Sequence, residues 1–126
     1  MDSSIRSKSV ATGRLGEAIA EQALLTKGYK VIDRNWRGPD GELDLVVCDE
    51  GYLVFVEVKA RRSTKFGTPE ESVLPHKQRR IVNTALAYLL ETAQQDKPWR
   101  VDIVAIVLSS ADKVIRLTHY VGIEIK

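Results

Sequence analysis

Two neighbouring apolar segments, Glu42–Cys48 and Tyr52–Ala60, restrict the fold of this chain more than any other feature of its sequence. Both are rich in valine and leucine, with few polar interruptions, as is typical of strands covered on both faces. The connection between them contains Glu50 and Gly51, and glycine tolerates the positive φ that tight hairpin turns require. The two segments therefore predict an antiparallel hairpin inside a covered sheet.

A two-residue turn at positions 50 and 51 fixes the register of this hairpin, and it places Asp44 opposite Glu57 and Glu42 opposite Lys59. Directly opposed residues have Cβ atoms about 5 Å apart, close enough for two carboxylates to bind one cation. Without a cation the two carboxylates would repel each other, and burying unpaired charge is costly. Hard oxygen ligands favour Mg²⁺ or Mn²⁺. The hairpin therefore predicts a divalent metal site at Asp44 and Glu57.

Lys59 lies two residues beyond Glu57 and is expected on the same face of the strand. A lysine beside metal-bound carboxylates can orient a water molecule or neutralise charge on a phosphate, and the metal activates both partners in hydrolysis. The alternative is a buried salt-bridge cluster in which Lys59 neutralises Asp44 and Glu57. A β-bulge would change the direct pairing but would keep these side chains near one another.

The remaining patterns predict an α/β (α+β) fold in the order αβββαββ, with a mixed sheet of about five strands flanked by helices. Residues 1–8 are expected to form a loose N-terminus and residues 9–126 a single domain. The first helix is expected to end at Gly28, and an apolar stripe runs along it. Glu17 lies off this stripe, on a second face of small apolar residues. That stripe consists of Leu15, Ala18, Ile19, Ala23 and Leu25. The predicted elements are a helix over 9–27, strands over 29–34, 42–48 and 52–60, a helix over 75–92, and strands over 99–108 and 114–120. A loop is expected over 35–41 because of its Gly and Pro content.

Charge and apolar content restrict the partners of the chain. Between Lys59 and Arg80 there are seven basic residues and two acidic ones, an excess that suits a phosphate backbone, although a solvated surface would show the same pattern. The candidates for nucleic-acid contacts are Arg61, Arg62, Lys65, Arg79 and Arg80. No apolar run approaches the ~20 residues of a membrane span, and we expect a cytoplasmic protein. The single cysteine, Cys48, excludes an internal disulfide.

Several motifs of the chain resemble a known family. Asp44 followed by Glu57-Val58-Lys59 resembles the signature of the PD-(D/E)xK nuclease superfamily, which has the restriction-endonuclease-like fold. Over residues 9–120 the chain resembles the YraN-type family of small bacterial proteins, which is similar to archaeal Holliday junction resolvases. The segments that carry this wider resemblance are Gly13–Glu17, Asn35–Asp44, Phe55–Arg61 and Arg100–Asp102.

The resemblance implies roles for five side chains. Asp44 and Glu57 would bind metal, Lys59 would assist catalysis, and Glu17 would reach the site from the first helix as a further metal ligand. Gln78 occupies a position where related nucleases carry a catalytic glutamine. From the residues alone, Glu17 is an exposed helix acid, and Gln78 is equally suited to cap its helix. Two positions depart from the superfamily patterns: Leu43 stands in place of the proline, and Val82 in place of a tyrosine.

The function expected from this resemblance is that of a Mg²⁺- or Mn²⁺-dependent endonuclease acting on DNA, with branched or structured DNA in repair or recombination as the first substrate class. A homodimer and a repair or recombination protein partner would suit that role. The alternatives are a non-catalytic nucleic-acid-binding module and, less favoured, an RNA-processing nuclease. Asp102 is interpreted as a structural residue that pairs with Arg100 or a basic neighbour. Trp36 could stack on a base, but packing against the core is the favoured role.

Overall fold

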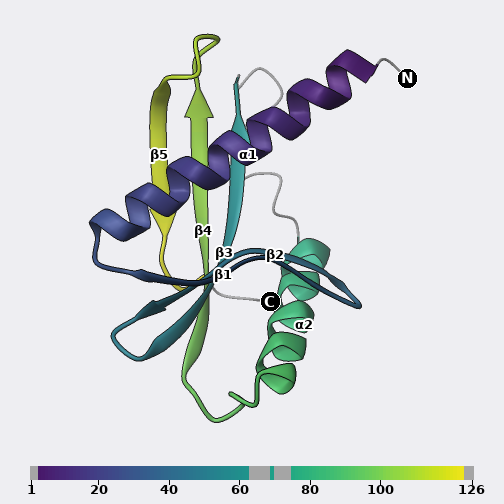
Figure 1. The fold of residues 1–126 in the computed structure, drawn as a ribbon, viewed down its shortest axis with the longest axis vertical. Helices are drawn as coiled ribbons and strands as arrows, with labels where there is room; N and C mark the ends of the chain where they lie inside the picture. Colours follow the sequence, from purple (N-terminus) through teal and green to yellow (C-terminus); the bar gives the residue numbers. More distant parts are fainter. Residues whose placement is uncertain (1–2, 63–68, 70–74, 124–126) are drawn as a thin grey trace.

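The computed structural model describes residues 3–62, 69 and 75–123. Its elements follow the predicted order αβββαββ (Figure 1). They are α1 (Ser3–Thr26), β1 (Lys30–Gly38), β2 (Gly41–Asp49), β3 (Tyr52–Arg61), α2 (Pro75–Glu91), β4 (Trp99–Leu108) and β5 (Val114–Tyr120). The predicted fold class, a mixed sheet flanked by helices, is confirmed. None of the helices in the described part of the chain is long and apolar enough to cross a membrane.

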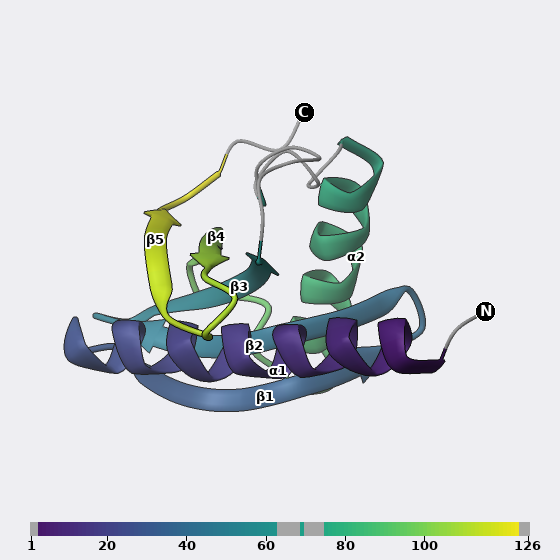
Figure 2. The ribbon, with the colours of Figure 1, turned by 90° about the horizontal axis from the view of Figure 1, so that it is seen from above.

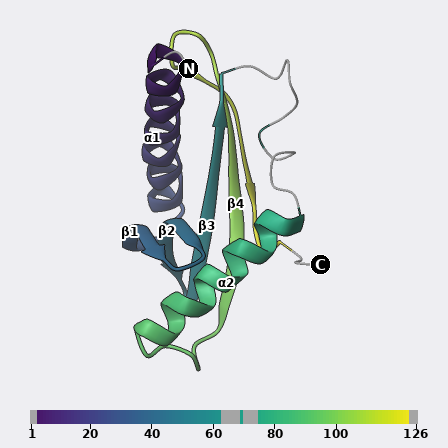
Figure 3. The same ribbon diagram turned by 90° about the vertical axis from the view of Figure 1, so that its right-hand side faces the viewer.

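The five strands form one sheet in the order β1-β2-β3-β4-β5. Neighbouring strands are antiparallel except for β3 and β4, which are parallel. Parallel neighbours need a long crossover connection, and here the connection contains α2. The two helices lie on opposite faces of the sheet (Figures 2 and 3). As a result, the central strands are covered on both sides, as their apolar composition predicts.

Two apolar cores lie on the two faces of the sheet. The core beneath α2 contains aromatic side chains that meet edge to face, among them Phe55 with Tyr88 at 5.7 Å and Trp36 with Tyr88 at 5.2 Å between ring centroids. The predicted packing of Trp36 against the core is thus confirmed. The core beneath α1 is aliphatic and includes Leu24 and Ile106.

α1 begins at Ser3, earlier than the predicted start at residue 9, and ends as predicted before Gly28. Gly28 has a φ of +92°, and its N–H donates to the carbonyl of Leu25 at 3.0 Å. The next N–H, from Tyr29, donates to the carbonyl of Leu24 at 3.0 Å. These two bonds form a Schellman motif, which satisfies the last carbonyls of the helix and explains why a glycine occupies this position.

The buried face of α1 differs from the predicted stripe. Ala18 and Leu25 are exposed, so their assignment to the stripe is wrong, whereas Leu15, Ile19 and Ala23 are half-buried. The fully covered positions are spaced by four residues: Thr12, Gly16, Ala20 and Leu24. Small residues on this face allow the helix backbone to approach the sheet closely, and apolar periodicity underrates such residues because they contribute little hydrophobic area.

The predicted loop over residues 35–41 is wrong for most of its length. β1 continues to Gly38, which pairs with Gly41 across a two-residue turn at Pro39 and Asp40. Asn35 lies inside the strand with a φ of +50°. The Gly and Pro content therefore marks the turn itself, whereas the aromatic contact of Trp36 keeps the flanking segment in the sheet.

Candidate active site

The central hairpin has the predicted register next to its turn but not at its far end. Asp49 pairs with Tyr52, and the ladder of described residues continues to Leu45 opposite Val56. The predicted pairs of Asp44 with Glu57 and of Glu42 with Lys59 lie beyond this point and are not part of the ladder, so the direct pairing is wrong. Instead, the Asp44 carboxylate oxygen Oδ2 accepts the backbone N–H of Val58 at 2.8 Å. A side chain thus occupies the position of a ladder partner and holds Asp44 against β3.

A cavity of about 330 Å³ lies where the ladder ends, between the hairpin and α2. It brings together Asp44, Glu57 and Lys59, the three residues that the sequence predicts as one group. Lys59 Nζ lies 3.2 Å from Glu57 Oε1, so the lysine is paired with one of the two carboxylates. The remaining lining residues come from the start of β2 and from α2: Gly41, Glu42, Lys77, Arg80, Ile81 and Thr84.

The carboxylates of Asp44 and Glu57 are not fully compensated by positive charge. Burial raises the pKa of Asp44 to about 7, and the nearby charge of Glu57 adds to this effect, against the N–H of Val58 and the charge of Lys59. Burial also raises the pKa of Glu57, although Lys59 opposes the shift. Lys59, together with Lys77 beside Glu57, therefore does not compensate both acids, and a cation placed between them would lower both pKa values.

A third and a fourth carboxylate approach Asp44 from the α1 side. Oxygen atoms of Glu17, Glu42 and Asp44 lie within 4.8 Å of one another, close enough for a single ion. A second cavity of about 410 Å³, lined by Glu17, Asn35, Arg37 and other residues, adjoins this group, and Glu42 lines both cavities. The structure thus brings Glu17 to the site, as the family resemblance implies.

Close packing of α1 on β3 is what carries Glu17 to this position. A Cβ atom built on Gly16 would lie 2.6 Å from the Cβ of Ala60, closer than real Cβ atoms come. Only glycine fits here without a shift of the helix or the strand. Glu17 is the next residue, so its backbone is also close to the sheet, and its side chain can reach Asp44.

Glu42 was not predicted as a site residue, yet it joins the carboxylate group. Its two-residue spacing from Asp44 on one strand is the signal that could have indicated a shared face. Lys77 was likewise not predicted, although it lines the cavity beside Arg80. In the sequence both residues have other charged residues nearby. The packing of α2 against the hairpin is what brings these two to the cavity.

The predicted nucleic-acid contacts are dispersed. Arg80 lines the cavity, whereas Arg79 is exposed on α2 and Arg61 is half-buried at the end of β3. Arg62 is directed away from the cavity, because its guanidinium pairs with Asp112 and donates to Thr12 Oγ1 at 2.9 Å. Lys65 lies outside the described residues, and Gln78 is half-buried on α2 but is not among the residues that line the cavity.

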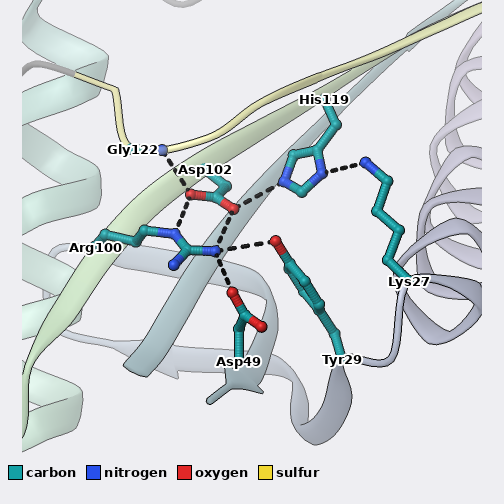
Figure 4. Close-up of polar contacts among 7 residues, drawn as sticks. All are labelled: Lys27, Tyr29, Asp49, Arg100, Asp102, His119 and Gly122. Carbon is teal, nitrogen blue, oxygen red and sulfur yellow. Dashed lines mark hydrogen bonds and ion pairs between the residues drawn. The ribbon is translucent and has the colours of Figure 1, made fainter. Parts of the chain in front are cut away.

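A second polar cluster lies at the turn end of the hairpin, near Asp49 (Figure 4). Its centre is the fully buried Asp102, whose carboxylate accepts hydrogen bonds from His119 Nε2 at 2.8 Å, the backbone N–H of Gly122 at 2.8 Å and Arg100 Nε at 3.0 Å. Burial alone would raise the pKa of Asp102, but these bonds outweigh it and hold the pKa below its usual value. The predicted pairing with Arg100 is confirmed, and the cluster ties the ends of β2, β4 and β5 together.

A known protein family matches the segment of the chain that carries the candidate site. The model of the family described as "Uncharacterised protein family UPF0102" matches residues 16–106, a stretch that contains all four carboxylates and Lys59. A UPF0102 protein of Renibacterium salmoninarum is 38% identical over 114 residues, which cover 90% of this chain and 96% of the relative.

Further relatives are members of the same family. A UPF0102 protein of Rhodococcus opacus is 44% identical over 100 residues, with 79% of this chain and 85% of the relative covered. One of Desulfosudis oleivorans is 45% identical over 94 residues, with 75% and 76% covered. The family match, over residues 16–106, contains the hairpin, α2 and the four carboxylates. The chain therefore belongs to the uncharacterised protein family UPF0102, the YraN-type family, within the PD-(D/E)xK nuclease-like superfamily.

Proposed function

We propose that this protein is a Mg²⁺- or Mn²⁺-dependent endonuclease that hydrolyses phosphodiester bonds of DNA. The observation that carries the proposal is a group of four carboxylates from α1, β2 and β3. Glu42, Asp44 and Glu57 line one cavity together with Lys59, Lys77 and Arg80, and Glu17 approaches Asp44 and Glu42 from the adjoining cavity. Carboxylates at the centre can hold a cation, and basic side chains at the rim can attract the phosphate group that approaches it.

The residues fit a hard divalent cation. Every donor at the centre is a carboxylate oxygen, the ligand type that Mg²⁺ and Mn²⁺ prefer. Asp44 and Glu57 are both buried enough for their pKa values to be raised, which a cation would reverse. Glu17, Asp44 and Glu57 are the proposed ligands, and Glu42 lies close enough to Glu17 and Asp44 to join them. A divalent cation at this position supplies Lewis acidity toward a phosphoryl oxygen.

The protein's own groups account for the remaining requirements of hydrolysis. Water attacks phosphorus in line and gives up a proton to solvent, while the bond from phosphorus to the leaving sugar oxygen breaks and that oxygen takes up a proton from solvent. Lys59 is held by Glu57, and 29% of its side chain is exposed, so its ammonium group can orient the water or stabilise charge that develops on the phosphate. Arg80 and Lys77 line the same cavity and are proposed to bind neighbouring phosphates of the same strand. Gln78 and Arg79, on the same helix, are proposed to contact the substrate from outside the cavity.

Branched or structured DNA is the substrate class that we propose to test first, because the family resemblance implies it. A homodimer would suit a junction by presenting two sites, and a repair or recombination protein would be the expected partner. Action on chromosomal DNA would place the protein in the cytoplasm. The alternative is a nucleic-acid-binding module without catalysis. Loss of Asp44 would abolish cleavage by a nuclease, whereas a binding module would keep its affinity for DNA.

The test is cleavage of a labelled panel with Mg²⁺ or Mn²⁺ by the wild type and by the variants Asp44→Asn and Lys59→Ala. The panel holds a four-way junction, a flap, duplex DNA, single-stranded DNA and matched RNA. Asp96→Asn and Lys30→Ala change the same residue types at exposed positions away from the cavity and serve as controls.

We expect metal-dependent cleavage that both site variants lose and both controls keep. Binding without cleavage, unchanged or tightened by Asp44→Asn, would contradict the nuclease and support the binding module. Cleavage of RNA in preference to the matched DNA would retain the mechanism and correct the substrate.

A further inference from the structure

Asn35 connects two carboxylates of the site that come from different elements. Its side-chain nitrogen Nδ2 lies 2.7 Å from Glu17 Oε1 on α1 and 3.0 Å from Glu42 Oε1 on β2. The amide nitrogen carries two hydrogens, so it can donate one to each carboxylate. One side chain on β1 thus joins the helix to the neighbouring strand at the point where their acids meet Asp44.

The backbone conformation at Asn35 is unusual for a strand residue. Its φ of +50° lies in the left-handed region, which asparagine tolerates better than most residues. The ladder pairs on either side, Arg34 with Leu45 and Trp36 with Leu43, place Asn35 across from Asp44. The strand therefore accepts an unfavourable conformation at a residue whose side chain meets both Glu17 and Glu42.

A neutral donor is chemically suited to this position. An arginine or lysine would hold the two acids together but would also cancel the negative charge that a cation needs. An amide brings the oxygens together and leaves their charge in place. Arg37 pairs with Glu42 Oε2 at 3.3 Å and so contacts one of the two acids, whereas the amide of Asn35, which is also an exposed residue, contacts both.

We propose that Asn35 is a positioning residue that holds Glu17 and Glu42 in register with Asp44, so that α1 and β2 present their oxygens to one cation. This role rests on the metal-dependent function proposed above. It explains why the chain keeps an asparagine with positive φ inside a strand. It also predicts that the geometry of the metal ligands depends on a residue that need not touch the metal.

The first experiment measures Mn²⁺ affinity of the full chain by the electron paramagnetic resonance signal of free Mn²⁺. Asn35→Gly removes the amide but keeps a residue that adopts positive φ without strain, so the fold is retained and the unfolding temperature verifies it. Asn83→Ala removes the same group from an exposed position on α2 and is the control. We expect the Kd for Mn²⁺ to rise roughly 10- to 100-fold in Asn35→Gly, as for other residues that orient metal ligands, and to stay unchanged in the control.

The second experiment reads the contacts without metal. In ¹⁵N-labelled protein the two side-chain amide protons of Asn35 are assigned by their absence in Asn35→Gly. We expect Glu17→Ala to shift one proton resonance and Glu42→Ala the other, whereas Glu91→Ala, at the exposed end of α2, shifts neither.

These outcomes separate the two proposals. Amide resonances that ignore both Glu17→Ala and Glu42→Ala would overturn the positioning role, as would wild-type Mn²⁺ affinity in Asn35→Gly. If the wild type binds no Mn²⁺ while the amide shifts occur as expected, the contacts are real but the metal-dependent function fails, and the role assigned to Asn35 fails with it.

Discussion

Replacing Gly16 by alanine tests how α1 is held against the sheet. In an exposed helix position, alanine is more favourable than glycine by about 1 kcal/mol. At Gly16 the new methyl group would lie 2.6 Å from the Cβ of Ala60, an atom fixed to the β3 backbone. Gly13 is the matched control, because it lies on the same helix and a Cβ built on it meets nothing within 4 Å.

The expected effects have opposite signs. Gly13→Ala should stabilise the protein by about 1 kcal/mol through helix propensity alone. Gly16→Ala gains the same amount but incurs an overpacking cost of about 1–3 kcal/mol, so it should be destabilising by about 1 kcal/mol in net. For a domain of this size, a difference of about 2 kcal/mol between the two variants corresponds to about 8 °C in Tm.

Thermal and urea unfolding of both variants would measure this difference. A rescue isolates its cause: in Ala60→Gly, the new methyl at position 16 would lie 3.9 Å from the Cα of residue 60, an ordinary contact. Gly16→Ala should therefore be stabilising in that background, with a coupling of about 1–3 kcal/mol. A Tm that rises in Gly16→Ala as much as in Gly13→Ala would refute the close packing that carries Glu17 to the site.

Three further changes probe the charges of the molecule. Because burial and a neighbouring glutamate raise the pKa of Asp44 to about 7, the folded state holds this proton more tightly than the unfolded chain, and ionisation costs stability increasingly from about pH 4 to about pH 7. Asp44→Asn should therefore raise Tm more at about pH 8 than at about pH 5, and an equal rise at both would contradict the shift. Arg80→Ala should lower the slope of log K for DNA binding against log salt by about 1, whereas Lys30→Ala should leave it unchanged. Asp102→Asn should lower the urea unfolding free energy by about 2 kcal/mol, because it removes the buried charge that accepts hydrogen bonds from Arg100, His119 and Gly122, while Asp49 still pairs with Arg100; a loss below about 1 kcal/mol would indicate that the cluster is dispensable.

Those parts of the fold that depend on local chemistry could be predicted from the sequence. The turn at Glu50 and Gly51 has φ values of +47° and +90°, the pattern of a type I′ hairpin turn, whose twist fits the flanking strands. It fixes the register of β2 and β3 as far as Leu45 and Val56. The end of α1 was predictable for the same reason, because Gly28 marks it by a local requirement for positive φ.

Side chains selected by long-range packing could not be predicted in the same way. Arg62 and Arg80 have the same chemistry, yet Arg62 is engaged by Asp112, fifty residues further along the chain, and Arg80 borders the cavity. Charge density along the sequence ranks the two equally. The difference arises from the angle at which α2 packs on the hairpin and from the position of the β4–β5 turn, neither of which has a local signature.

The error at Asp44 has a specific physical origin. Leu43 and Leu45 lie two residues apart and would share a face in a regular strand, yet Leu43 belongs to the core beneath α2 and Leu45 to the core beneath α1. β2 must therefore rotate at Asp44, and the positive φ of Asn35 in the adjacent strand accommodates the same distortion. This rotation ends the ladder, frees the N–H of Val58 for the Asp44 carboxylate and lets acids from both faces of the sheet meet. A register extended from the turn therefore brings Asp44 near Glu57 and Lys59, as observed, but assigns Asp44 the wrong direct partner. The reason is that the site lies beyond the point where regular pairing of β2 and β3 ends.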